Sequence, residues 1–97
     1  MELKEIIFTE SLPKIDLHGL DRDTARVQVN DFIRDNIKLK NEIIVIIHGI
    51  GSGILKNTVH ETLRKNKSVI EYKTLYNNNG STIVKIRRDE IWMTVKN

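Results

Sequence analysis

Two histidine–glycine pairs are the residues of this chain whose types and spacing suggest chemistry. His18 and Gly19 close a short alternating segment, and His48 and Gly49 close a run of β-branched residues. Imidazole titrates near neutral pH, so two such rings close together could act as one general base and one general acid. Asp16 stands two residues before His18, where it is either solvated or hydrogen-bonded to a neighbouring backbone group.

A glycine-rich segment follows the second histidine and leads directly into a predicted helix. The first amides of a helix lack intrahelical partners and carry the positive end of its dipole, so they suit a phosphate oxygen. The same glycines would also serve a tight strand-to-helix turn. The candidate phosphate-contacting residues at this edge are Gly49, Gly51, Ser52, Gly53, Lys56, Arg22 and Arg26.

Hydrophobic periodicity predicts the elements that position these residues. The predicted elements, in chain order, are a strand over 14–18, a helix capped by Asp21 and running to about Lys40, a strand over Ile43–Ile47, a helix from Ile54 or Leu55 to Asn66, and strands over Val69–Leu75 and Thr82–Arg87 joined around Asn77–Gly80. This order predicts an α/β fold, a two-layer β-α-β-α-β-β sandwich with a mixed four-stranded sheet.

The first two strands should be parallel, because a whole helix connects them. Their carboxyl ends then lie side by side, which brings His18 and His48 to the edge where α/β proteins usually bind ligands. His60 lies off the apolar stripe of the second helix, so we expect it at the surface.

The strand Ile43–Ile47 is apolar on both faces, as in central strands that are covered on each side. Two helices cover only one face of a four-stranded sheet. The second face therefore needs another cover, for which the candidates are Ile6–Phe8, Ile91–Met93 or a partner chain.

The composition limits the class of protein. The chain has 97 residues, which indicates one domain, and a net charge of +3. It has no cysteine, which excludes disulfides, thiolate metal sites and cysteine nucleophiles. Its longest apolar run is far shorter than the roughly 20 residues that cross a bilayer. The acidic start does not resemble a secretory signal. We expect a cytoplasmic chain with no membrane partner, in which 1–12 extend a domain over 13–88 and 89–97 form a tail.

Other motifs fail on spacing. The glycines stand at i, i+2 and i+4 rather than in the dinucleotide pattern, and neither a nucleoside-triphosphatase loop nor a nucleophile elbow is present. Asp16, His18 and His48 together could hold a metal, but no motif specific to metal sites supports this.

Three segments resemble one family. Ile15-Asp16-Leu17-His18-Gly19, His48-Gly49-Ile50-Gly51-Ser52-Gly53 and Gly80-Ser81-Thr82-Ile83-Val84 are similar, in type and spacing, to the signatures of Smr (small MutS-related) domains. The resemblance runs from about Pro13 to Arg87. In the family the loop before the last strand is rich in glycine, whereas here it reads Asn77-Asn78-Asn79-Gly80.

The resemblance implies a fold like the C-terminal domain of translation initiation factor 3 and a nicking endonuclease or nuclease acting on DNA or RNA. It ties Asp16 and His18 to cleavage, and His48, Gly49 and Gly51 to nucleic-acid contact or cleavage. Members occur at the end of MutS2 ATPases and alone, so this chain is expected to be a stand-alone member or an excised piece, with roles in DNA repair and recombination or in RNA and ribosome quality control.

Two functions follow. In the first, His18 and His48 transfer protons during phosphodiester cleavage while Asp16 orients or charges the site. RNA could be cleaved without metal, whereas DNA favours a divalent cation such as Mg or Mn. In the second, the same edge only binds nucleic acid or the ribosome. A protein-interaction domain is a third, less favoured interpretation.

Overall fold

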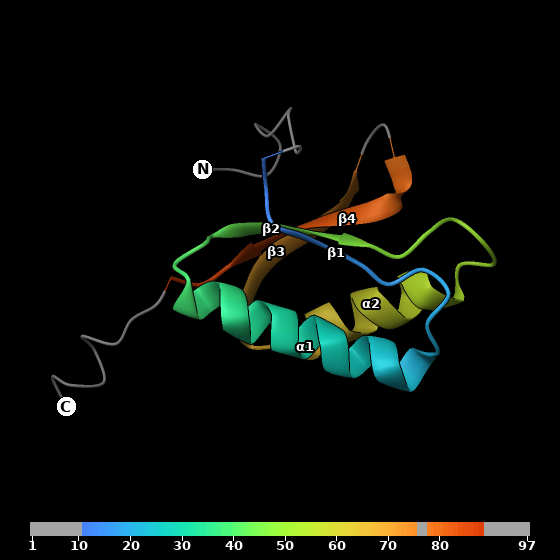
Figure 1. Cartoon of the computed structure of the whole chain (residues 1–97), viewed down its shortest axis with the longest axis horizontal. Helices are drawn as coiled ribbons and strands as arrows, with labels where there is room; N and C mark the ends of the chain where they lie inside the picture. The colour runs from blue at the N-terminus through green and yellow to red at the C-terminus, as the bar shows by residue number, and fades with distance from the viewer. Residues whose placement is uncertain (1–10, 76–77, 89–97) are drawn as a thin grey trace, which may run out of the picture.

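Six regular elements follow one another in the predicted order. The computed structural model describes residues 11–75 and 78–88. The elements are β1 (Lys14–Asp16), α1 (Arg22–Lys38), β2 (Ile43–Ile47), α2 (Ile54–Lys65), β3 (Val69–Leu75) and β4 (Asn78–Ile86). Both helices lie on one side of the sheet, so the molecule has two layers (Figure 1). Neither helix of this described part is both long and apolar enough to span a membrane.

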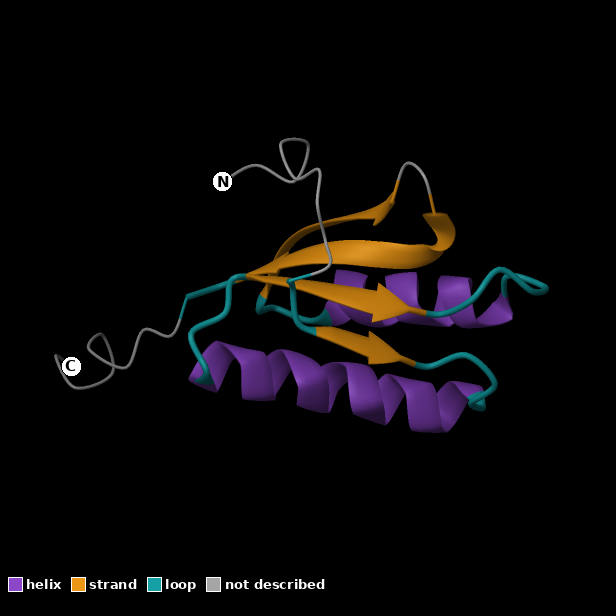
Figure 2. Cartoon of the chain, turned by 45° about the horizontal axis from the view of Figure 1, so that its top comes forward, coloured by secondary structure: helices purple, strands orange, loops and turns teal. Residues whose placement is uncertain are grey.

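The sheet is mixed, with the strand order β1-β2-β4-β3. β1 pairs in parallel with β2, and Ile15 stands opposite Ile46. β4 is antiparallel to both of its neighbours, β2 and β3. Figure 2 shows α1 below these strands and α2 behind them. The predicted fold class is therefore confirmed, and the parallel pair places the ends of β1 and β2 at one edge.

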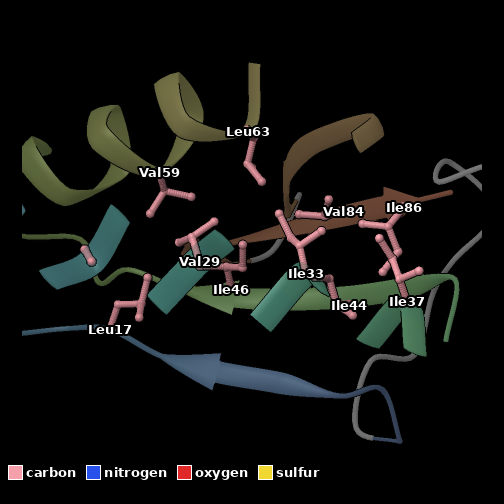
Figure 3. Close-up of a cluster of buried hydrophobic side chains, with 11 residues drawn as sticks. Leu17, Val29, Ile33, Ile37, Ile44, Ile46, Val59, Leu63, Val84 and Ile86 are labelled. Carbon is pink, nitrogen blue, oxygen red and sulfur yellow. The ribbon is translucent and has the colours of Figure 1, made fainter. Parts of the chain in front are cut away.

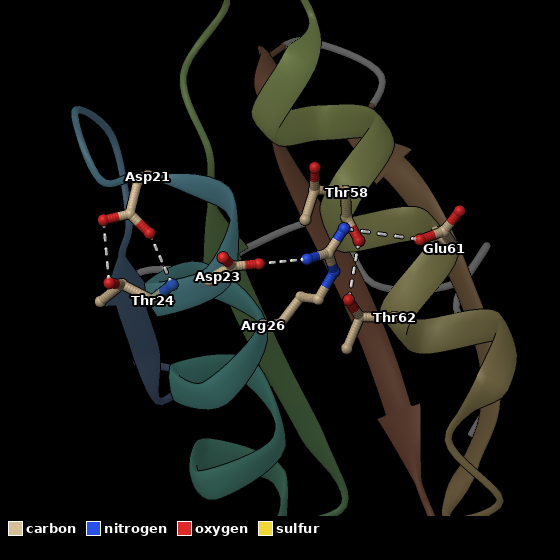
Figure 4. A network of polar contacts seen from close by, with 7 residues as sticks. All are labelled: Asp21, Asp23, Thr24, Arg26, Thr58, Glu61 and Thr62. Carbon is tan, nitrogen blue, oxygen red and sulfur yellow. Dashed lines mark hydrogen bonds and ion pairs between the residues drawn. The ribbon is translucent and has the colours of Figure 1, made fainter.

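α1 begins at the predicted cap. The Asp21 carboxylate accepts hydrogen bonds from the Thr24 backbone N–H at 2.8 Å and the Thr24 hydroxyl at 3.1 Å (Figure 4). The helix ends at Lys38, slightly before the predicted end near Lys40. Lys40 has a φ of 65°, a left-handed conformation that cannot continue a right-handed helix.

The main core lies between the helices and the sheet (Figure 3). Its buried side chains are Leu17, Ala25, Val29, Ile33, Ile37, Ile44, Ile46, Val59, Leu63, Val84 and Ile86. Successive strand residues face opposite sides, so Ile44 and Ile46 join this core while Ile43 and Val45 face away from it. Leu17 in the core and exposed Asp16 and His18 confirm the alternation predicted for the first strand.

A smaller apolar cluster lies on the other face of the sheet. Ile43, Val45 and Ile83 are buried there, with Leu12, Ile47 and Leu75 packed against them. The prediction that Ile43–Ile47 is covered on both faces is thus confirmed for the four residues from Ile43 to Ile46, all of which are buried. Two of the covers considered above, Ile6–Phe8 and Ile91–Met93, lie outside the described residues.

The last strand is longer than predicted. It begins at Asn78, not Thr82, because its pairing with β3 continues as far as Leu75 opposite Asn78, past an irregularity between Thr74 and Leu75. An asparagine-rich segment is typical of a turn, but here cross-strand pairing extends into it. As a result Gly80 belongs to β4, next to the end of β2.

Candidate functional site

The two histidine–glycine pairs lie against each other at the carboxyl ends of β1 and β2. The Leu17 N–H donates to the Ile47 carbonyl at 2.7 Å, which continues the parallel pairing past β1. Gly49 has a φ of 82°, and a Cβ built on it would lie 3.3 Å from the Cβ of His18. Both the backbone conformation and this close approach therefore favour glycine at 49.

The second pair is held from the other side by β4. The carbonyl of Gly80 accepts the backbone N–H of His48 at 2.8 Å and that of Gly49 at 3.0 Å. These bonds fix where the loop leaves β2. The segment that begins at Gly80 thus holds the segment that begins at His48 in place.

His18 and Asp16 form an exposed hydrogen-bonded pair. Nδ1 of His18 lies 2.6 Å from Oδ1 of Asp16, and the same oxygen accepts the His18 backbone N–H at 3.1 Å. The side chains are 72% and 51% exposed. The hydrogen bond raises the pKa of His18 and, from the other side, lowers the pKa of Asp16. The carboxylate thus orients the ring and leaves Nε2 for a substrate.

His48 is buried, unlike His18. It is 3% exposed, and both of its ring nitrogens have partners. Nδ1 lies 3.0 Å from the carbonyl of Gly49, and Nε2 lies 2.9 Å from Oγ1 of Thr82. Burial lowers the pKa of His48, and the charge of Lys56 lowers it further. The structure therefore places His48 at the predicted edge, but its ring turns towards β4 and, unlike that of His18, has both nitrogens bonded to protein atoms.

His60 completes this cluster and is half-buried, rather than exposed at the surface as expected. Its Nε2 lies 2.8 Å from the same Thr82 hydroxyl, and its ring meets those of His48 and Tyr72 edge-on, with centroids 6.0 and 5.1 Å away. Burial lowers the pKa of His60. One sequence signal could have identified Thr82, which stands two residues before core Val84 and so shares its face of β4.

The site opens into a cleft of about 640 Å³ between the loop after β1 and the loop before α2. The residues lining this cleft are His18, Gly19, Leu20, Asp21, Arg22, His48, Gly49, Ile50, Gly51, Ser52, Gly53, Ile54, Leu55 and Lys56. Of the predicted site residues, all but Asp16 and Arg26 line it, and Asp16 is bonded to His18.

The first turn of α2 forms one wall of the cleft. Gly53 is the N-cap, with a φ of 86° and no side-chain cap bond, and the hydroxyl of Ser52 lies 3.4 Å from the backbone nitrogen of Ile54. First-turn amides have no intrahelical partner. These N–H groups and Lys56 give this wall a positive potential suited to an anion.

Arg26 is placed elsewhere. Its guanidinium contacts Asp23 at 2.6 Å and Glu61 at 4.0 Å, in the space between the two helices (Figure 4). Arg22, one turn earlier, does line the cleft. Across the described residues, no group of three histidine or acidic side chains is arranged to hold a metal ion.

Comparison with known proteins agrees with this geometry. Residues 15–87 match the family described as Smr domain. The chain belongs to the Smr domain family. The crystal structure of the Smr domain of Thermus thermophilus MutS2 superposes with a TM-score of 0.77 at 26% identity, covering 78% of this chain and 99% of that one. YdaL, a stand-alone small MutS-related protein from Escherichia coli, shares the fold at a TM-score of 0.68 and 22% identity, covering 82% and 70% of the two chains.

Curated relatives of this Smr domain carry the name endonuclease MutS2. That of Aquifex aeolicus is 34% identical over 77 residues, which is 79% of this chain and 10% of the relative. That of Streptococcus mutans is 39% identical over 75 residues, 73% of this chain and 10% of the relative. The chain thus spans about a tenth of the length of the curated relatives it matches. The predicted family is confirmed.

Proposed function

We propose that this Smr domain binds nucleic acid in the cleft and cleaves a phosphodiester there. The observation that carries the proposal is the Asp16–His18 pair, 2.6 Å apart and exposed, beside a cleft whose opposite wall is the amino end of α2. A base next to an anion-binding wall is the arrangement that phosphodiester cleavage needs. The name of the MutS2 relatives, endonuclease, supports the same activity.

His18 is the proposed proton acceptor. Its Nδ1 bonds to Asp16, so Nε2 is the nitrogen that meets substrate. On RNA, Nε2 would take the proton of the 2′-hydroxyl, whose oxygen attacks the phosphorus as the bond to the 5′-oxygen breaks. The leaving oxygen takes a proton from water, which enters the open cleft. Asp16 stabilises the imidazolium that forms, as the carboxylate of a hydrolase triad does.

Phosphate binding is assigned to the loop before α2 and its first turn. The negative charge that develops in the transition state would meet the backbone N–H groups of that turn, Lys56 and Arg22. Ser52 adds a hydroxyl at the same wall. Arg26 has no part in this proposal, because its guanidinium is paired with Asp23 and Glu61 outside the cleft.

His48 does not transfer protons in this proposal. Its ring is buried and both nitrogens are bonded to protein atoms, so no nitrogen is free for substrate. DNA lacks the 2′-hydroxyl, so cleavage of DNA would require an activated water, for which a divalent cation such as Mg or Mn is the usual means.

The test uses purified protein with labelled single-stranded RNA, duplex DNA and branched DNA, each with and without a chelator. We expect cleavage of at least one substrate. In His18→Ala cleavage should fall by about a hundredfold or more, the usual contribution of a general base, with binding retained. Lys38→Ala, at the far end of α1, is the matched control and should cleave like the parent.

Binding without cleavage of any substrate by the parent protein would overturn the enzymatic proposal and favour a non-catalytic nucleic-acid or ribosome-binding module. Equal cleavage by His18→Ala and the parent would remove His18 from the mechanism. Loss of cleavage in chelator for DNA alone would show that only DNA needs the cation.

A further inference from the structure

Two histidines share one threonine hydroxyl beneath the cleft. Nε2 of His48 and Nε2 of His60 lie 2.9 and 2.8 Å from Oγ1 of Thr82, which is fully buried. A hydroxyl has one proton to donate. At most one of the two rings can therefore accept from Thr82, so at least one must donate to it.

The Gly49 carbonyl determines which ring donates to the Thr82 hydroxyl and which ring accepts from it. A carbonyl only accepts, so Nδ1 of His48, at 3.0 Å, must carry a proton. A neutral His48 then has a bare Nε2, which accepts the Thr82 hydroxyl. That hydroxyl oxygen must in turn accept from Nε2–H of His60. The order of donors is therefore His60, Thr82, His48 and the Gly49 carbonyl.

This order requires both rings to be neutral, and the pKa of each ring is shifted in the direction that favours the neutral form. Burial lowers the pKa of each ring. For His60, the neighbouring His48 ring and the charge of Lys56 lower the pKa further. A cationic His48 would donate from both ring nitrogens. The Thr82 oxygen would then accept from both His48 and His60, and the Thr82 hydroxyl proton could no longer be donated to Nε2 of His48.

The last bond of the chain orients a peptide in the cleft. The carbonyl of Gly49 points to the His48 ring, so the Ile50 N–H of the same trans peptide plane points the opposite way. Within the described part of the chain this N–H has no hydrogen-bond partner. Gly49 and Ile50 both line the cleft, and Ile50 as a residue is 72% exposed.

We propose that His60 is a positioning residue, which acts through Thr82 and His48 to hold the Gly49–Ile50 peptide so that the Ile50 N–H binds a phosphate oxygen of the substrate. This rests on the phosphate binding proposed above. His60 stands on α2, outside both histidine–glycine motifs, and its hydrogen bond towards the site runs through the shared hydroxyl.

Two pairs of variants separate this role from packing. His60→Gln keeps an N–H donor at the end of the side chain, whereas His60→Leu removes it. Thr82→Ser keeps the hydroxyl, whereas Thr82→Val removes it with little change of shape. All four are made in the His18→Ala background, so that the probe, a short fluorescein-labelled oligouridylate, is bound without being cleaved.

The first measurement is the tautomer of each ring, from long-range proton–nitrogen NMR spectra of the protein without ligand at neutral pH. We expect the proton on Nδ1 of His48 and on Nε2 of His60. A proton on Nε2 of His48 instead would overturn the proposed order. Because this measurement needs no ligand, it can refute the proposed order of donors whether or not the protein binds nucleic acid.

The second measurement is the affinity for the oligouridylate. Losing one hydrogen bond to a charged phosphate should weaken binding about tenfold in His60→Leu and Thr82→Val. His60→Gln and Thr82→Ser should stay within about threefold of their background, because a donor or hydroxyl remains. Equal binding by all four variants would overturn the positioning role. Failure of the His18→Ala parent itself to bind the oligouridylate, and duplex and branched DNA in its place, would overturn both the phosphate-binding role and the proposed function.

Discussion

Gly49 lies directly against His18, since a Cβ on the glycine would come within 3.3 Å of the histidine Cβ. The second loop of the site is therefore in contact with the residue that we propose as the base. Any side chain at position 49 pushes on His18, and any shift of the loop changes the space beside its ring.

Gly49→Ala should destabilise the protein more than Gly19→Ala. Both glycines have a similar positive φ, of 82° and 84°, but an added Cβ at Gly19 meets nothing within 4 Å. The backbone conformation alone should cost about 1–2 kcal/mol at either position. Contact with His18 should cost Gly49→Ala roughly a further 1 kcal/mol. Urea unfolding of both variants measures the difference, and equal losses would show that His18 yields without cost.

Asp16→Asn should lower the pKa of His18. The carboxylate raises that pKa chiefly through its hydrogen bond to Nδ1, so the amide should let it fall towards its ordinary value of 6.5. If His18 is the base, the acidic limb of the pH–rate profile moves to lower pH and the maximum rate falls. An NMR titration of His18 gives the pKa directly. Asp23→Asn, which removes an acid paired with Arg26 instead, is the control. An unchanged His18 pKa in Asp16→Asn would contradict this account.

Acid should destabilise the fold through His48 and His60. Burial holds their pKa values below the ordinary 6.5, so the unfolded chain binds more protons as the pH falls through that value. Their contribution is complete above pH 6.5 and decreases below it until both rings are protonated in the folded state. His18, whose pKa is raised, contributes with the opposite sign.

The measurement is therefore the free energy of unfolding against pH in His18→Ala. We expect it to decrease between neutral pH and pH 5, and to decrease less when His60→Gln is added, because one titrating ring is gone. A flat profile in His18→Ala would show that these rings keep ordinary pKa values.

Lys56→Ala should weaken nucleic-acid binding and reduce its salt dependence, whereas Arg26→Ala should do neither. Lys56 lines the cleft, and Arg26 is paired with Asp23 and Glu61 outside it. Removing one phosphate contact should reduce the slope of log affinity against log salt by about one unit. Fluorescence anisotropy across a salt series measures both variants. A larger loss in Arg26→Ala would show that the substrate reaches past the cleft to the groove between the helices.

Much of the fold was readable from local pattern. The alternation around Ile15 and Leu17, the run Ile43–Ile47 and the helical stripe through Val29 and Ile33 each reflect burial of a side chain on a periodic element. A helix between two strands then requires them to be parallel, and this brings His18 and Gly49 together. The partnership of Asp16 with His18 is equally local, because the two residues are separated by a single position.

What the sequence determined by itself is therefore the order of elements, the edge at which the cleft lies and most of the residues predicted to line it, although not the place of Arg26. Tertiary structure decided the difference between the histidines. His18 faces solvent, whereas His48 and His60 meet at Thr82, across separations of 34 and 22 residues. No local periodicity encodes that meeting. It depends on the register of β4 beside β2 and on how α2 lies over the sheet, and these follow from packing of the whole core.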